Sequence, residues 1–327
     1  MGADRPSGEL LNRLHWRGRM DLCLYTDSVS ELSFEAALDL AASVGCRSIE
    51  IAGGGQSKAP HLRLGELLGD SRKRTEFADA FARRGLRIAA LNCSAWPMHP
   101  IHGPVQEAIV RDTIRLAGEL GVETVVSMSG TPGDGPGAST VDWIFYPWPE
   151  DAVALQRHQW EVAVPFWQDM AAHAAENGVR HVALELHPLH LVFNVPTLLR
   201  MRQEVGPIIG VNMDPSHLFW QQMDPLAAIE ALGSAIQHVH LKDTGLQPDR
   251  LALAGVLDTT PFEDATQRAW VFRTVGRVHD GAWWASFIAK LRSVGYDGAL
   301  SIENEDPYQT HVDGVEEAAA FILPLIG

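Results

Sequence analysis

The sequence predicts an α/β fold in which eight parallel strands alternate with helices and close into one (β/α)8 barrel. Three observations favour this fold. Short β-branched or apolar runs alternate with longer helical patterns, several helical patterns stop at a glycine just before the next run, and the connections after the runs are longer than those before them. One barrel of this kind can extend over all 327 residues.

The eight candidate strands are short runs rich in β-branched and aliphatic residues. In chain order they cover residues 20–25, 48–52, 87–92, 124–129, 181–186, 209–214, 238–242 and 299–304. Helical patterns between them include residues 33–45, 75–85, 105–121 and 282–295. The glycines expected to end helices in a left-handed backbone conformation are Gly45, Gly85, Gly121, Gly178 and Gly295.

Three strand-to-helix connections are long, and in such barrels these connections build the active-site face. They cover residues 92–104, 129–151 and 244–280. The last is a long insertion after the seventh strand, and because unstructured loops of that length are uncommon in compact domains, we expect it to contain helix and to act as a lid or substrate wall. The predicted organisation is a flexible N-terminal segment, residues 1–19, followed by a single catalytic domain, residues 20–327.

The composition restricts the partners and the compartment. With 26 basic and 41 acidic residues the formal charge is −15, which on average repels nucleic acid and anionic membranes and suits a protein that concentrates a cation. The three cysteines, Cys23, Cys46 and Cys93, have no metal-type spacing, which argues against a disulfide framework and a thiolate zinc site. Without a secretory or membrane-spanning pattern, we expect a cytoplasmic protein.

A potential metal ligand stands at the end of each of the last four predicted strands: Glu185, Asp214, His240 and Glu303. A single acid at a strand end is more often a helix cap, but strand ends in a closed barrel converge, so four groups can meet around one ion. Acids within apolar strands also need a counter-charge. Three carboxylates and one imidazole predict one divalent metal ion, with manganese (Mn²⁺) preferred and Mg²⁺, Co²⁺ or Zn²⁺ as alternatives.

The order Glu, Asp-x-x-His, His-x-His-x-x-Asp and Glu on these strand ends resembles the xylose isomerase-like TIM barrel superfamily, over about residues 20–325. That superfamily includes sugar isomerases, ketose 3-epimerases, inosose dehydratases, hydroxypyruvate isomerases and endonuclease IV. The resemblance implies that the four residues bind the metal, that His217 contacts substrate, and that Glu185 and Glu303 move protons on opposite faces of a keto-sugar. A carboxylate that binds a metal through one oxygen can still act as a base through the other.

One departure from the ketose epimerases concerns substrate binding. Those enzymes usually carry an arginine shortly after the histidine motif of strand 7, whereas this chain has Lys242 there and no arginine before Arg250. A guanidinium can hold two substrate oxygens, so we expect Arg273, Arg277 or His279 of the insertion to take this role. Arg277 is the preferred substrate contact. The alternative is that Arg277 is a surface arginine paired with Asp280 or Glu305.

Further candidates lie beside the predicted mouth. His187 should point the same way as Glu185 and is either a catalytic residue or a backbone hydrogen-bonder. Glu50, in the second strand, either contacts substrate or is a buried structural acid bonded to neighbouring strands. The candidates for stacking on a sugar or an aromatic aglycone are Trp96, Trp143 and Trp148.

Four functions compete. The first is isomerisation or epimerisation of a keto-sugar by proton abstraction next to its carbonyl. The second is a lyase that uses α-proton abstraction and β-elimination to dehydrate an inosose or to cleave 3-keto C-glycosides. The insertion and its TVGRVHD segment resemble the catalytic subunits of C-glycoside deglycosidases, which work with a small second subunit. An endonuclease IV-like phosphodiesterase and a non-catalytic barrel are the remaining two. The expected partners are a sugar or glycoside substrate and either further copies of this chain or a small second subunit.

Overall fold

The computed structural model describes residues 20–327, and the predicted flexible segment 1–19 lies outside the described residues. Eight parallel strands close into a barrel in the order β1-β10-β7-β6-β5-β4-β3-β2, so the predicted fold class is confirmed. Each predicted run overlaps one of these strands. They are β1 (Asp21–Tyr25), β2 (Ser48–Ala52), β3 (Arg87–Cys93), β4 (Thr124–Ser127), β5 (His181–Glu185), β6 (Ile209–Met213), β7 (Ile236–Leu241) and β10 (Ala299–Ile302).

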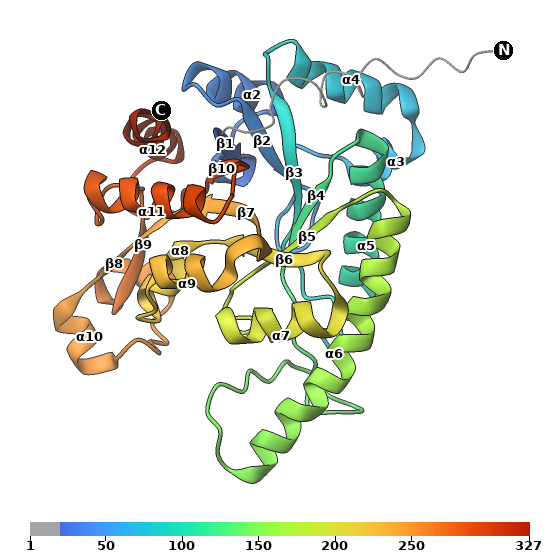
Figure 1. Cartoon of the computed structure of the whole chain (residues 1–327), viewed down its shortest axis with the longest axis vertical. Helices are drawn as coiled ribbons and strands as arrows, with labels where there is room; N and C mark the ends of the chain where they lie inside the picture. Colours follow the sequence, from blue (N-terminus) through green and yellow to red (C-terminus); the bar gives the residue numbers. More distant parts are fainter. Residues whose placement is uncertain (1–19) are drawn as a thin grey trace.

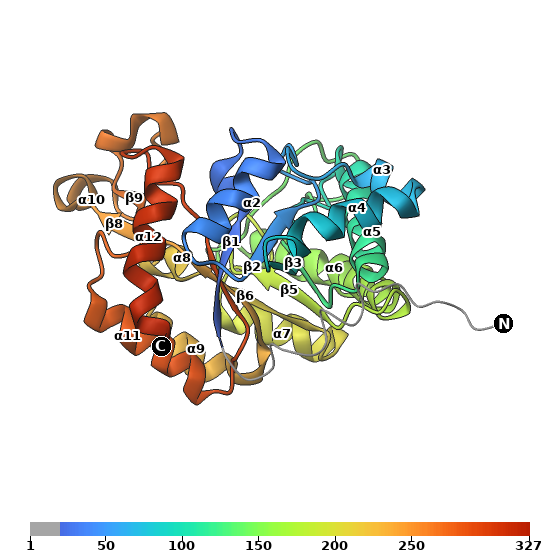
Figure 2. The same ribbon diagram turned by 90° about the horizontal axis from the view of Figure 1, so that it is seen from above.

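The barrel closes where the first and last strands pair. Residues Asp21 to Leu24 of β1 lie beside Ala299 to Ile302 of β10 in parallel register. Seen from above, the blue and red ends of the described chain therefore lie next to each other (Figure 2).

Helices surround the barrel (Figure 1). Several helices begin at a side-chain cap. The Ser33 side chain accepts a hydrogen bond from the backbone N–H of Ala36, and the Asp280 side chain accepts one from the backbone N–H of Trp283. The five glycines predicted to end helices all have positive φ. The helices that follow the barrel strands are α2 (Phe34–Ser43), α3 (Leu64–Gly69), α4 (Ser71–Ala82), α5 (Gly103–Leu120), α6 (Glu150–Glu176), α7 (Val195–Val205), α8 (Pro215–Trp220), α9 (Pro225–Leu232), α11 (Gly281–Ser293) and α12 (His311–Ile326), with 3-10 turns η1 (Thr26–Val29) and η2 (Gly233–Ala235).

The main core lies between the barrel and the helices, where Trp167 of α6 and Trp284 of α11 are fully buried. The inside of the barrel is different. Small apolar residues of β3, β4 and β5 form one side of it: Ala90, Val126 and Ala183. Polar side chains fill the rest, centred on the fully buried Glu50 of β2. The barrel thus carries a buried polar group directly beneath its C-terminal mouth.

The insertion after β7 contains a two-stranded antiparallel sheet as well as the expected helix. Strand β8 (Asp243–Leu246) pairs with β9 (Trp270–Arg273), and between them lie α10 (Pro248–Ala254) and the 3-10 turn η3 (Phe262–Gln267). Ala269, Trp270 and Phe272 of the insertion form a small apolar core together with Trp220 of α8. The hydroxyl of Thr244 donates to the carbonyl oxygen of Ser216, which joins the insertion to α8.

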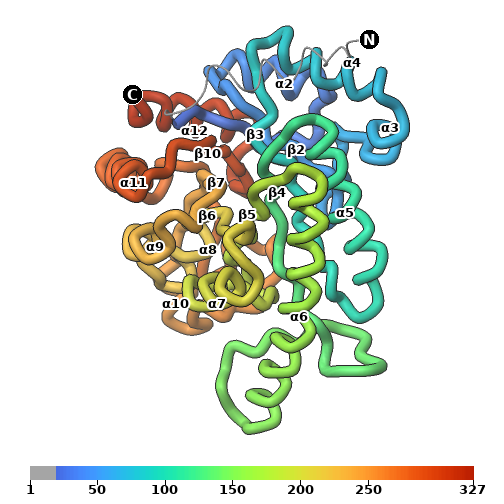
Figure 3. The backbone as a smooth tube through the Cα atoms, turned by 45° about the vertical axis from the view of Figure 1, so that its right-hand side comes forward, coloured from blue at the N-terminus to red at the C-terminus, as the bar shows by residue number. Residues whose placement is uncertain are grey.

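The connection from β4 to α6 is long and irregular, because residues 128–149 form no helix or strand. The amide of Gln159 on α6 donates to the carbonyl oxygens of Pro132 and Asp142 and so fixes its course. This connection and the first half of α6 project from the barrel (Figure 3). None of the helices within residues 20–327 is long and apolar enough to cross a membrane.

Candidate metal centre

The structure brings the four predicted metal ligands together at the C-terminal mouth of the barrel. One ligand atom from each of Glu185, Asp214, His240 and Glu303 lies within 4.8 Å of all the others. Glu185 ends β5, Asp214 follows β6, His240 lies in β7 and Glu303 follows β10. The arrangement arises because neighbouring parallel strands present their C-terminal ends at the same edge.

His240 is oriented by an acid behind it. Its Nε2 lies 3.1 Å and 3.0 Å from the two carboxylate oxygens of Glu50, while its Nδ1 faces Glu303 Oε2 at 2.9 Å and Glu185 Oε2 at 3.5 Å. Tyr25 stacks on the ring. A histidine whose outer nitrogen bonds a carboxylate presents the other nitrogen to a metal in a fixed direction. Nδ1 is therefore the atom that would bind the ion.

Glu50 itself does not face the mouth. It is fully buried and accepts hydrogen bonds from Asn92 at 2.7 Å, His238 at 2.8 Å and Ser301 at 2.7 Å. Burial would raise the pKa of this carboxyl, but His240 and His238 more than offset that and hold the pKa well below its usual value. The predicted substrate contact does not fit this position, whereas the alternative, a buried structural acid, does.

Lys242 places a buried ammonium among the carboxylates. Its Nζ lies 2.7 Å from Glu303, 2.9 Å from Glu305 and 3.3 Å from Asp214. Burial would lower the pKa of Lys242, but these acids, Glu303 first, raise it well above its usual value. The side chain therefore carries a positive charge that compensates part of the acidic cluster.

The two glutamates of the cluster have opposite pKa shifts. Burial, together with the charge of Glu303, raises the pKa of Glu185 to about 7. For Glu303, burial acts in the same direction, but Lys242 and His240 hold its pKa well below the usual value. Two buried carboxylates and the partly buried carboxylate of Glu303 repel one another at this distance, and a divalent cation among them would relieve that repulsion. The donor set therefore fits a divalent metal.

Two histidines extend the cluster on the side of Glu185. Nε2 of His217 lies 3.3 Å from Glu185 and 3.4 Å from Asp214. The His187 ring packs edge-on against His217, and its Nδ1 is 2.7 Å from the carbonyl oxygen of Pro188, which leaves Nε2 free to accept a proton. Burial is the main cause that lowers the pKa of each to about 4. Both imidazoles are thus neutral at physiological pH.

A cavity of about 1170 Å³ opens above this cluster. Its floor includes Glu185, His187, His217, Lys242 and Glu303. The insertion forms one wall through residues 256–262 and 270–272, and the connection from β4 to α6 adds Trp143 and Phe145. The insertion thus stands where a substrate wall was expected.

Several predicted contacts lie outside this cavity. Arg273 pairs with Asp306 at 2.9 Å, Arg277 bonds Glu317 of α12, and His279 Nδ1 lies 2.6 Å from Asp243. Trp96 packs against His190. Arg277 is therefore a surface arginine, with Glu317 as its partner instead of Asp280 or Glu305.

Arg268 is the arginine that the insertion presents to the cavity. Sequence reasoning missed it, because strand β9 (Trp270–Arg273) was not predicted. Arg268 lies two residues before this strand and lines the cavity together with Trp270, Val271 and Phe272. The aromatic run WVFR, interpreted as a strand, was the signal that could have located this stretch.

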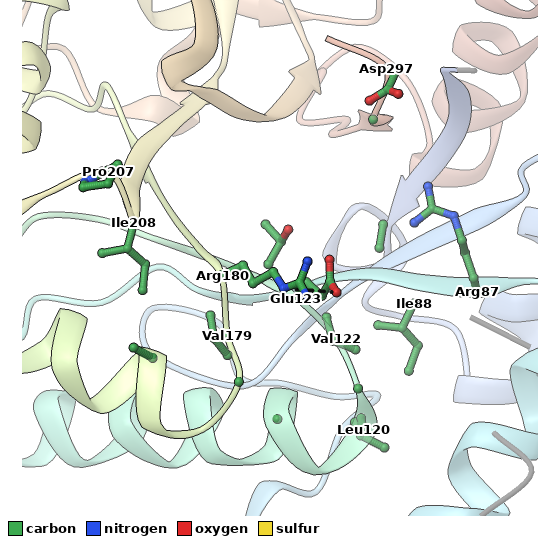
Figure 4. A pocket seen from close by; sticks show the side chains of 17 residues that line it. Arg87, Ile88, Leu120, Val122, Glu123, Val179, Arg180, Pro207, Ile208 and Asp297 are labelled. Atoms are coloured by element: carbon green, nitrogen blue, oxygen red, sulfur yellow. Dashed lines mark ion pairs between the residues drawn. The ribbon is translucent and has the colours of Figure 1, made fainter. Parts of the chain in front are cut away.

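A second cavity, of about 1190 Å³, lies at the opposite end of the barrel (Figure 4). It is lined by residues near the starts of the strands, including Arg87, Ile208 and Asp297. Its charges are mostly paired, as Arg180 with Glu123 at 3.4 Å and Arg87 with Asp21 at 2.8 Å. The ligand cluster is at the other end, where barrels of this type carry their active sites.

Comparisons with known proteins agree with this architecture. Residues 38–325 match the family model "Xylose isomerase-like TIM barrel". The chain is 43% identical over 291 residues to the uncharacterized protein YfiH of Bacillus subtilis (strain 168), covering 88% of this chain and 93% of that protein. It is 30% identical over 158 residues to the rhizopine catabolism protein MocC of Rhizobium meliloti, covering 48% and 46%.

Solved structures of similar fold include the zinc-binding IOLI protein, at 17% identity and a TM-score of 0.67, covering 94% of this chain and 98% of that one. The probable 3-DHS dehydratase AsbF of Bacillus anthracis has the same identity and TM-score, covering 93% and 99%. A D-psicose 3-epimerase has 14% identity and a TM-score of 0.62, covering 94% and 100%. Likenesses this distant show the fold alone. From the family match and the relative in Bacillus subtilis, the chain belongs to the xylose isomerase-like TIM barrel family.

Proposed function

We propose that this protein is a divalent-metal-dependent enzyme that removes a proton next to the carbonyl of a keto-sugar or sugar-like substrate, as sugar isomerases and epimerases do. The observation that carries the proposal is the convergence of Glu185, Asp214, His240 and Glu303 below an open cavity. Two of its structural neighbours, a D-psicose 3-epimerase and a probable 3-DHS dehydratase, are named for reactions of this general kind.

A divalent ion held by these four residues would polarise the substrate carbonyl and lower the free energy of the enediolate. The oxygen-rich donor set favours Mn²⁺, with Mg²⁺, Co²⁺ and Zn²⁺ as alternatives. Nδ1 of His240, whose ring is fixed by Glu50, would supply the nitrogen ligand.

The protein's own groups then move the proton. Glu185 can bind the ion through one carboxylate oxygen and accept and return a proton through the other. His187 adds a neutral imidazole on the same side of the cluster, next to His217. Glu303, kept ionised by Lys242 at 2.7 Å, is the second carboxylate in reach of substrate. An epimerisation uses one base on each face of the sugar, and Glu185 and Glu303 are the proposed pair.

A second candidate is a lyase of the same family, favoured by the size of the cavity. A base removes the proton α to a ketone, a double bond forms, and the group on the β carbon departs with its bonding electrons and takes up a proton. Inosose dehydration and cleavage of 3-keto C-glycosides both follow this course. The cavity of about 1170 Å³ leaves space for a departing group beyond the sugar.

The test combines metal analysis with proton exchange in deuterated water. A panel of ketohexoses, inososes and 3-keto glycosides is incubated with the metal-loaded protein, and deuterium next to the carbonyl is followed by NMR. Epimers or isomers identify the first candidate, and unsaturated products identify the lyase.

Glu185→Gln should lower exchange about 10² to 10⁴-fold, as expected for loss of a general base. A matched control is Glu230→Gln on the surface of α9, where the native side chain pairs with Lys290. Exchange in Glu185→Gln within a few-fold of the parent protein would remove Glu185 from the proton-transfer step.

A further inference from the structure

We infer that the cavity takes a sugar that carries an aromatic substituent, and that an apolar wall above the metal centre binds this substituent. The wall comprises Trp143 and Phe145 of the connection after β4 together with Val256, Leu257, Phe262, Trp270 and Phe272 of the insertion. The inference rests on the proposed function only in placing the sugar ring at the metal centre.

The size of the cavity gives the first argument. Its volume of about 1170 Å³ exceeds the roughly 300–1,000 Å³ of sites that bury drug-sized ligands. A single sugar ring at the metal centre would therefore fill only part of it. The remaining space lies against the apolar wall.

The distribution of polar groups gives the second argument. Charged and imidazole side chains occupy the floor, where Glu185, His217 and Glu303 meet. The apolar wall instead presents large exposed rings, since Phe145 is 50% exposed and Phe262 is 60% exposed. Exposed apolar groups gathered in a concave site mark a place where apolar ligand surface is removed from water.

Two charged side chains of the insertion that line the cavity are already bonded within the protein. Asp258 accepts from the backbone N–H groups of Thr260 and Ala269. Arg268 donates to the carbonyl oxygens of Thr260 and Trp270, and its guanidinium lies over the rings of Phe262 and Trp270, 4.1 Å and 4.5 Å from their centroids. These two side chains are therefore engaged before a ligand binds, and an aromatic ring can pack against the wall without needing their hydrogen bonds.

The rings are also held in place before any ligand binds. Trp220 of α8 stacks on Trp270 with centroids 4.8 Å apart and an angle of 9° between the ring planes. Arg268 and Phe262 continue this stack outward. Because the stack is built by packing within the protein, a ligand ring meets a surface that needs little ordering, which strengthens binding.

Equilibrium binding of unreactive glycosides tests the inference. Phenyl β-D-glucoside and methyl β-D-glucoside share the sugar and lack the carbonyl, so neither can undergo the proposed proton abstraction. Isothermal titration calorimetry with the metal-loaded protein should give at least about tenfold tighter binding of the phenyl glycoside, which corresponds to about 1.4 kcal/mol. Phe145→Ala and Phe262→Ala should each remove several-fold of this preference and leave binding of the methyl glycoside unchanged.

Two exposed neighbours provide matched controls, because neither lines the cavity: Tyr146→Ala beside Phe145, and Leu253→Ala on α10. Both should keep the full preference. Cyclohexyl β-D-glucoside and cellobiose separate an aromatic site from a merely apolar site and from a second sugar site. The inference is overturned if either binds as tightly as the phenyl glycoside, or if the phenyl preference is absent or survives both Phe→Ala changes. If the protein prefers the phenyl glycoside but catalyses no proton exchange, the proposed function is refuted and the aromatic binding site still stands.

Discussion

Lys242 and a bound metal ion would share the same carboxylates. The ammonium lies 2.7 Å from Glu303 and 3.3 Å from Asp214, and both acids belong to the ligand set. Two unit positive charges about 4 Å apart repel by about 4 kcal/mol at an effective dielectric constant of 20, and a divalent ion doubles this energy. The lysine therefore limits how tightly the site can hold a cation while it keeps Glu303 ionised.

We predict that Lys242→Met tightens binding of Mn²⁺ by at least about tenfold, a conservative fraction of that repulsion. Calorimetric titration of the metal-free protein measures this directly. Lys290→Met, which removes a surface lysine from its pair with Glu230, should leave the affinity unchanged. Weaker binding in Lys242→Met would mean that the lysine organises the carboxylates more than it competes for them.

Glu50 acts on the metal through His240. Its carboxylate lies 3.0 Å and 3.1 Å from Nε2 of that ring, so it fixes the ring and makes Nδ1 a stronger ligand. We predict that Glu50→Gln weakens metal binding about 10- to 100-fold, the usual effect of removing such a partner. Ser301→Ala, which removes only one of the hydrogen bonds that Glu50 accepts, should weaken it less. Equal affinity in Glu50→Gln and the parent protein would reduce Glu50 to a packing role.

The insertion is the element that shapes the cavity, and two buried aspartates anchor it. Asp243 accepts hydrogen bonds from the backbone N–H groups of Val278 and His279. Asp306 accepts hydrogen bonds from the backbone N–H of Thr274 and from Nε of Arg273. Both contacts lie at the base of the β8–β9 sheet. The predicted substrate-binding residues Arg273 and His279 thus serve this anchoring.

The pKa of Asp306 gives the anchor a pH dependence. Burial would raise this pKa, but the backbone N–H groups of Thr274 and Tyr308 and the guanidinium of Arg273 lower it below its usual value. A carboxyl with a depressed folded-state pKa stabilises the fold above its unfolded value of about 3.9 and loses that contribution as pH falls toward the folded value.

Hydrogen exchange in β8 and β9 should therefore become faster as the pH is lowered below about 4, after correction for intrinsic exchange. Asp306→Asn should show the faster exchange already at pH 7. Asp249→Asn, on the exposed helix α10, is the control and should match the parent protein. Unchanged protection in Asp306→Asn at pH 7 would assign the anchoring to Asp243 alone.

The barrel strands were predictable because each carries a buried apolar run, and the last four end in ligands of one chemical kind. The β8–β9 sheet was not, because the strand DTGL has little β character and its partner follows a long connection instead of a tight turn. Position along the chain placed the insertion at the mouth, but the direction of each side chain depends on that strand pairing. This is why Arg268 was missed and Arg277 was preferred.

The position of Glu50 shows a second limit. Its place in β2 predicted an acid in the barrel, but its partners His238, His240 and Ser301 come from β7 and β10, far along the chain. Only the closed barrel brings them together. Whether such an acid faces a ligand or supports one is decided by these distant partners.

At the scale of the whole molecule, metal binding and barrel folding are linked. The four ligands lie in or directly after four different strands, so the unfolded chain does not present them together. A ligand that binds the folded state alone stabilises it by mass action, by about 2.7 kcal/mol at a free concentration 100 times its Kd. The metal should therefore act as a stabiliser of the entire barrel.

We predict that Mn²⁺ at 100 times its Kd raises the Tm by about 5 °C, since each kcal/mol shifts a chain of this size by roughly 2 °C. Differential scanning calorimetry measures the shift, and a chelator should reverse it. Glu303→Ala, tested at the same Mn²⁺ concentration, should show almost no shift while still unfolding in one cooperative transition. Arg180→Ala, at the cavity on the opposite end of the barrel, should keep the full shift because its charge is remote from the ligand cluster. If Glu303→Ala were stabilised as strongly as the parent protein, the ion would bind elsewhere on this acidic chain.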